Sequence, residues 1–131
     1  MPDPTPARTH APVSQPYPDL IDDLNAAIVR LRSGAAEPMR AFSALAREAL
    51  RPGALDVKTK ELIAMGIAVA VRCDGCIGFH AKAAIRAGAS RDELLETLAM
   101  AIYMGAGPAM IYAAEALRAY DELAPGAPAA A

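Results

Sequence analysis

Apolar residues recur every three or four positions along most of the chain, which is the spacing of one face of an α-helix. No stretch alternates apolar and polar residues as a half-buried β-strand would. We therefore expect an all-α protein, a bundle of about six helices. The expected helices cover residues 19–33, 37–51, 57–71, 74–88, 90–104 and 108–123.

Capping and breaking residues separate these segments. Asp56 can cap the third helix, and Ser90 with Glu93 forms a capping box at the start of the fifth. Gly88 suits the end of the fourth helix, and Pro108 fits the first turn of the sixth. These signals predict short connections between neighbouring helices.

Two of the predicted helices bear on assembly. In the second, Phe42 and Leu45 lie on the apolar face, which we expect to point into the core. The third, residues 57–71, is apolar almost all round after Glu61. Such a helix lies in the centre of a fold or at a subunit contact, so we expect a homo-oligomer. The alternative is a tightly packed, alanine-rich monomer.

The ends of the chain differ from this helical part. Residues 1–18 are rich in proline and predict a flexible arm that contributes nothing to the core, although an arm laid over a neighbouring subunit is the alternative. Residues 124–131 predict a disordered tail. Residues 19–123 are then one helical domain.

Composition and charge exclude several kinds of partner. The formal net charge of -2 leaves no excess of lysine and arginine for nucleic acid or for a membrane surface. The most apolar window, residues 62–71, is too short to span a bilayer, and the first residues lack the apolar run of a secretory signal. We expect a cytoplasmic protein, in which a Cys-x-x-Cys pair is more often catalytic or metal-binding than a permanent bridge.

Four residues stand out as candidates for chemistry: Cys73, Cys76, His80 and Glu61. Cys76 falls in the first turn of the fourth helix, where free amide groups stabilise a thiolate, and His80 lies one turn further along the same face. Cys73 precedes the helix and can form a reversible disulfide with Cys76. If the third and fourth helices form an antiparallel hairpin, Glu61 returns to the level of His80 and can orient it.

Other interpretations of these residues stay open. The four could in principle hold zinc, although structural zinc sites favour cysteine and histidine, or the cysteines could be a casual buried pair. A covalent haem would need histidine where Ile77 stands, and no βαβ pattern indicates a thioredoxin-like domain.

Residues from about 55 to 120 resemble the alkylhydroperoxidase AhpD / carboxymuconolactone decarboxylase-like family. The resemblance rests on the pattern of Glu61, then Cys73-x-x-Cys76, then His80. It implies an AhpD-like all-α fold that assembles as trimers or hexamers. It also implies a peroxidase or disulfide-reductase activity that uses no metal and no cofactor.

The resemblance further implies a role for each residue. Cys76 attacks the peroxide, Cys73 resolves the product as a disulfide, and Glu61 with His80 relays protons. The well-studied AhpD-type enzymes have another histidine inside the motif, where this chain has Asp74 and Gly75. The true lactone decarboxylases of the family lack the cysteine pair, which argues against that activity here.

The sequence therefore predicts a thiol-dependent peroxidase with a hydroperoxide substrate and a dithiol or protein electron donor. The alternatives are a redox-sensing or small-molecule-binding oligomer without turnover, or a decarboxylase-like member of the family. Four residues are candidates for a substrate pocket, although residues of these types are more often plain core: Phe79, Met65, Tyr103 and Met104.

Overall fold

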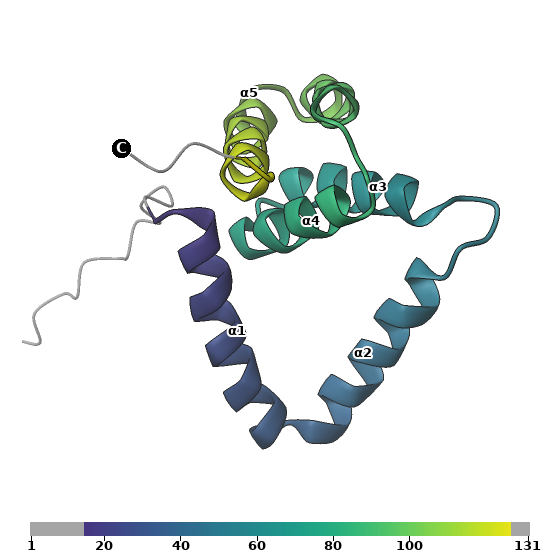
Figure 1. Cartoon of the computed structure of the whole chain (residues 1–131), viewed down its shortest axis with the longest axis vertical. Helices are drawn as coiled ribbons and strands as arrows, with labels where there is room; N and C mark the ends of the chain where they lie inside the picture. The colour runs from purple at the N-terminus through teal and green to yellow at the C-terminus, as the bar shows by residue number, and fades with distance from the viewer. Residues whose placement is uncertain (1–14, 127–131) are drawn as a thin grey trace, which may run out of the picture.

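The computed structural model describes residues 15–126, which form five α-helices and no β-strand. Figure 1 shows α3, α4 and α5 packed together, while α1 and α2 extend from them. The prediction of an all-α fold is confirmed, but the count is five helices and not six. The helices are α1 (Tyr17–Gly34), α2 (Ala36–Leu50), α3 (Val57–Ala70), α4 (Asp74–Arg86) and α5 (Arg91–Leu123).

The difference in number lies in α5, which takes in both the fifth and the sixth predicted segments. Ala106 inside it has φ 55° and ψ -142°, which is not helical, and Pro108 follows in the next turn. A β-carbon at Gly105 would lie 2.6 Å from the β-carbon of Ala109, so the break requires glycine there. Its two arms run in different directions (Figure 1).

The core is formed mainly by α3, α4 and α5. α3 packs against both of the others, and α4 packs against α5. The largest fully buried side chains of these helices are Met65, Ile77, Leu94 and Val69. Small alanine side chains on α4 and α5 fill the remaining contacts, which allows the helices to approach closely.

α1 begins earlier than the sequence predicts. Its first residue is Tyr17, preceded by Pro16, so the last two residues of the expected arm belong to a helix. Tyr17 is fully buried, and the prediction that nothing before residue 19 enters the core is wrong at this residue. The sequence suggested an arm here because proline usually interrupts a helix. In the first turn of a helix, however, proline is tolerated, because the amide it lacks would have no partner there. Residues 1–14 and 127–131, which hold most of the predicted arm and most of the tail, lie outside the described residues.

Tyr17 fastens α1 to the second arm of α5. Its hydroxyl donates to Glu115 at 3.1 Å, and the guanidinium of Arg118 lies 4.6 Å from the centre of its ring. Burial and the nearby Glu115 carboxylate raise the pKa of Tyr17, so the phenol keeps its proton and remains a donor.

α2 contacts α1 and the start of α3 but buries none of its own residues. Phe42 and Leu45, which the sequence predicts to face the core, are each 64% exposed. That prediction is wrong for a single chain, because periodicity identifies the face that needs covering but not what covers it.

α5 is the one described helix that is long and apolar enough, by length and mean hydropathy, to cross a membrane. Helices in the cores of soluble proteins also meet this criterion. The break at Ala106 leaves two arms. Each arm is shorter than the roughly 20 residues that a span requires. Composition alone therefore gives little support for a membrane-spanning role.

Candidate active site

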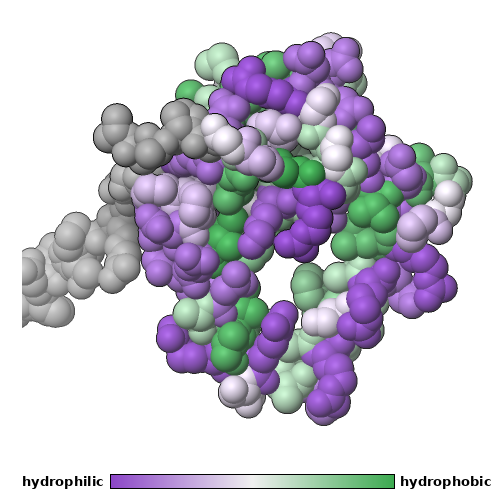
Figure 2. All heavy atoms as spheres, viewed as in Figure 1, coloured by the Kyte–Doolittle hydropathy of each residue, from purple (hydrophilic) through white to green (hydrophobic). Residues whose placement is uncertain are grey.

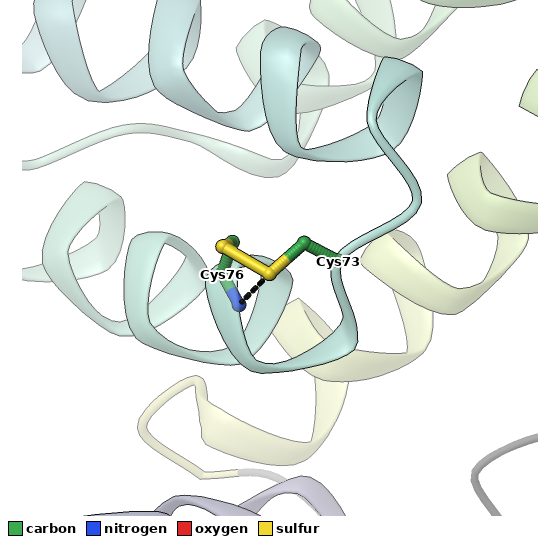
Figure 3. The surroundings of a disulfide bond; sticks show 2 residues. All are labelled: Cys73 and Cys76. Carbon is green, nitrogen blue, oxygen red and sulfur yellow. Dashed lines mark hydrogen bonds between the residues drawn. A yellow bond between two sulfur atoms is a disulfide. The ribbon is translucent and has the colours of Figure 1, made fainter. Parts of the chain in front are cut away.

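The two cysteines form a disulfide at the start of α4, shown in Figure 3. Their α-carbons are 5.2 Å apart, within the usual range for a bridged pair. Cys73 is the N-cap residue, and its sulfur accepts a hydrogen bond from the amide of Cys76 at 3.2 Å. The pair therefore occupies the place where a helix offers unpaired amide groups.

The chain reaches this position through a tight reversal after α3. Arg72 has φ 60°, a left-handed conformation in which an arginine is unusual. The Arg72 amide donates a hydrogen bond to the carbonyl of Val69 at 3.2 Å. The Cys73 amide donates one to the carbonyl of Ala68 at 3.1 Å. These two bonds make a Schellman motif, which ends α3 and turns the chain directly into α4.

The two sulfurs differ in their surroundings. The backbone N–H of Cys76 donates a hydrogen bond to the sulfur of Cys73, whereas the sequence predicts that free amides stabilise Cys76. Cys76 instead packs against the buried core cluster and precedes His80 by one helical turn. Cys73 thus has a backbone N–H donor at its sulfur, whereas Cys76 has a histidine one helical turn further along α4.

Glu61 and His80 meet between α3 and α4. Nδ1 of His80 lies 2.7 Å from Oε2 of Glu61, so the two helices form the antiparallel hairpin that brings these residues together. Glu61 is only 3% exposed, while the His80 side chain is 35% exposed. A buried carboxylate needs a partner to offset its lost hydration, and the imidazole is that partner. The carboxylate in turn fixes the ring, which leaves Nε2 available to another group.

α1 packs against the cysteine motif at two glycines of α4. A β-carbon at Gly75 would lie 2.9 Å from Cδ1 of Leu24, and one at Gly78 would lie 3.1 Å from Cδ1 of Tyr17. A side chain at position 75 would therefore require the Leu24 side chain to turn away.

The predicted pocket residues are dispersed. Met65 is fully buried in the core, Phe79 is half-buried, and Tyr103 and Met104 are largely exposed. Met104 alone of the four lines a groove of about 770 Å³ between α3 and α5. That groove extends to Arg72, which precedes Cys73. No sequence pattern had singled out Arg72.

A second groove, also of about 770 Å³, reaches Glu61 from the other end of α3. Lys58 and Arg86 add positive charge to its wall. Lys58 is held by Glu93 at 2.8 Å, and their mutual hydrogen bond raises the pKa of Lys58 and lowers that of Glu93. Sequence periodicity could not have found this groove, since it depends on how α2, α3 and α4 pack.

Within residues 15–126, no three side chains of the types that bind metals are close enough together to hold an ion. Both sulfurs are joined to each other in this structure. The chemistry that the arrangement itself offers is thiol and disulfide exchange beside a histidine and a buried carboxylate.

Comparison with known proteins places this fold and site in a family. The characteristic sequence of the carboxymuconolactone decarboxylase family matches residues 36–119, which include all four candidate residues. The chain therefore belongs to the carboxymuconolactone decarboxylase family.

Several relatives are similar over most of their length. An uncharacterized protein of Cupriavidus necator is 44% identical over 92 residues, which are 69% of this chain and 81% of that protein. A carboxymuconolactone decarboxylase family protein from Legionella pneumophila, solved by crystallography, is 50% identical with a TM-score of 0.80. That likeness covers 82% of this chain and 96% of the other.

A more distant crystal structure comes from Thermotoga maritima. It is 30% identical to this chain, with a TM-score of 0.71. The similarity covers 79% of this chain and 88% of the Thermotoga maritima chain. That protein is described as a family member with a possible involvement in antioxidative response.

Proposed function

We propose that this chain is a thiol-dependent peroxidase that reduces hydroperoxides through Cys73 and Cys76. The observation that carries the proposal is the disulfide at the N-terminus of α4, with the Glu61–His80 pair one turn further along. Membership of the family and the antioxidative description of the Thermotoga maritima protein also support it.

The proposed cycle begins with the reduced pair. The thiolate of Cys76 attacks one oxygen of the hydroperoxide, the O–O bond breaks, and an alcohol leaves after taking up a proton. Cys76 becomes a sulfenic acid. The thiol of Cys73 then attacks that sulfur, water is released, and the disulfide forms. Two electrons have passed from the two thiols to the peroxide.

A dithiol donor completes the cycle. One of its thiols attacks the disulfide to give a mixed disulfide, and its second thiol then displaces the protein. Both cysteines return to the thiol state, and the donor leaves as a disulfide. The donor is either a small dithiol or a protein with a similar pair.

His80 and Glu61 have separate tasks in this proposal. A proton on Nδ1 of His80 is shared with Glu61, so Nε2 accepts the proton that Cys76 loses. The carboxylate stabilises the imidazolium that results, which keeps Cys76 ionised. The same proton can then be delivered to the departing alkoxide. Glu61 acts only through His80 and is therefore a positioning residue.

Turnover distinguishes this proposal from a sensor that changes shape when oxidised. With tert-butyl hydroperoxide and an excess of a dithiol, the proposal expects each chain to consume many equivalents of peroxide, at a rate proportional to protein concentration. The measurement is peroxide remaining against time, with a background without protein. Loss of a single equivalent per chain followed by a stop, despite remaining donor, would favour the sensor.

A further inference from the structure

We propose that the groove between α3 and α5 is a binding site for a fatty acid. In the proposed complex the carboxylate pairs with Arg72, and the hydrocarbon chain lies along α3. This inference concerns the binding of a ligand and does not depend on the proposed peroxidase activity.

The α3–α5 groove has the size and the depth of a small-molecule site. Its volume of about 770 Å³ falls within the range that such sites usually have. Its lining includes Val69 and Ala109, which are both buried, so the floor of the groove is part of the core. The lining residues of α3 begin at Thr59 and continue to Arg72 just past its end, a distance of about 20 Å along a helix. A hollow of this length suits an extended chain.

The lining of the groove is apolar except near one charge. Arg72 is the one charged residue among the described residues that line it, and two threonines are the other polar ones. The remaining walls are apolar and include Ile67 and Met100, which are largely exposed to solvent. The opening between α1, α2 and the body differs, because both hydrophilic and hydrophobic side chains lie at its edge (Figure 2). The α3–α5 groove therefore matches a ligand with one anionic head and an apolar body.

Arg72 is available to bind that head. Within residues 15–126 no ion pair and no side-chain hydrogen bond engages its guanidinium. A guanidinium presents two parallel N–H donors that match the two oxygens of a carboxylate. The free acid is thus complementary to both parts of the groove. A protein partner would instead be expected to bring a polar rim, for which the lining offers little.

The backbone gives an independent reason to examine this groove. Among the described residues, two that are not glycine have a positive φ, and both lie at the groove. Arg72 lines it with φ 60°, and Ala106, with φ 55°, follows Gly105, which also lines it. Strained backbone of this kind occurs often at ligand sites. Glycine would take the conformation at position 72 more easily, so the arginine side chain is the feature that a ligand would explain.

A calorimetric titration of the oxidised protein tests the site. With dodecanoate, kept below the concentration at which it forms micelles, one molecule is expected to bind per chain. Hexanoate should bind at least about a hundredfold more weakly, because each methylene group that leaves water adds to the affinity. Dodecyl phosphate is the third ligand. If it bound more tightly than dodecanoate, the head group would be a phosphate ester and the proposed carboxylate would be wrong.

Arg72→Gly tests the contact with the head group. The variant should fold as the parent does, because glycine readily takes the φ of 60° found at this position. It is expected to weaken the binding of dodecanoate by roughly 10- to 100-fold, because a hydrogen-bonded charge is lost. Arg47→Ala is the matched control, since it removes an exposed arginine of α2 that does not line the groove. The control should bind dodecanoate as the parent does.

Gly66→Leu tests the path of the hydrocarbon chain. Gly66 lines the groove, and a β-carbon there would lie 3.9 Å from Cγ2 of Thr97, an ordinary contact, so a side chain can begin at this position without a clash. The leucine should fill the groove and abolish binding. Two results would overturn the proposal: a parent that binds no dodecanoate, as expected if a second copy of the chain covered the groove, or Arg72→Gly and Gly66→Leu variants that bind it as the control does. None of these titrations measures peroxide, so failure here is distinct from failure of the proposed activity.

Discussion

Replacing Cys76 with serine is expected to slow hydroperoxide reduction by roughly a thousandfold or more, because a serine hydroxyl is not ionised near neutral pH and cannot attack the O–O bond as a thiolate does. The measurement is stopped-flow consumption of tert-butyl hydroperoxide by the fully reduced protein. The parent should react in a single fast phase, and the variant should match the rate without protein.

Cys73→Ser is the matched control for that experiment. This variant retains the proposed nucleophile and His80, so it should consume one equivalent of peroxide and stop at a sulfenic acid on Cys76. A reagent that traps sulfenic acids should label that residue. If Cys76→Ser keeps the fast phase and Cys73→Ser loses it, the roles are reversed. Cys73 would then be the nucleophile, stabilised by the hydrogen bond that its sulfur accepts from the backbone N–H of Cys76.

Glu61→Gln is expected to lower the rate of the same reaction by about 10- to 100-fold. The amide can still bond to His80, but it does not stabilise the imidazolium that forms when Cys76 loses its proton. The reaction rate should therefore rise with pH through an inflection that lies at a higher pH in the variant than in the parent. This shift is a readout that a loss of packing alone would not produce.

Glu96→Gln is the matched control for Glu61→Gln, because it makes the same substitution at an exposed carboxylate on α5. Its rate and pH profile should stay within about a factor of two of the parent. A Glu61→Gln variant with the parent's rate and the parent's inflection would show that the buried carboxylate does not act through His80.

Local signals predicted much of the fold. Asp56 caps α3 through a bond to the amide of Thr59, and Ser90 with Glu93 forms the capping box of α5. Each cap joins residues three apart in the chain, so it can be predicted from the sequence alone. The break after Gly105 was also visible as a cluster of glycine and proline, although Ala106, and not a glycine, takes the positive φ of 55°.

The approach of Glu61 to His80 could be predicted because a hairpin of two adjacent helices is the simplest arrangement of that segment. What the sequence could not provide was the conformation of Arg72, since arginine rarely takes the left-handed form that closes the hairpin. The packing of Leu24 on Gly75 was equally hidden, because it joins residues of two helices far apart in the chain.

Tyr17, Phe42 and Leu45 mark the limit of periodicity. Tyr17 is buried although prolines surround it, and the other two are exposed although they lie on an apolar face. In each case the pattern is local while burial depends on distant partners. For Tyr17 the partner is α5, and for the two α2 residues the described part of this chain offers none that covers them.

Single-turnover stoichiometry tests the central claim most directly. Fully reduced parent is mixed with one equivalent of tert-butyl hydroperoxide, quenched with acid at successive times, and analysed for alcohol, free thiols and peptide masses. Two thiols should disappear for each alcohol formed, and the disulfide between Cys73 and Cys76 should be the sole oxidised form of the protein. Peroxide that persists while both thiols stay reduced would contradict it.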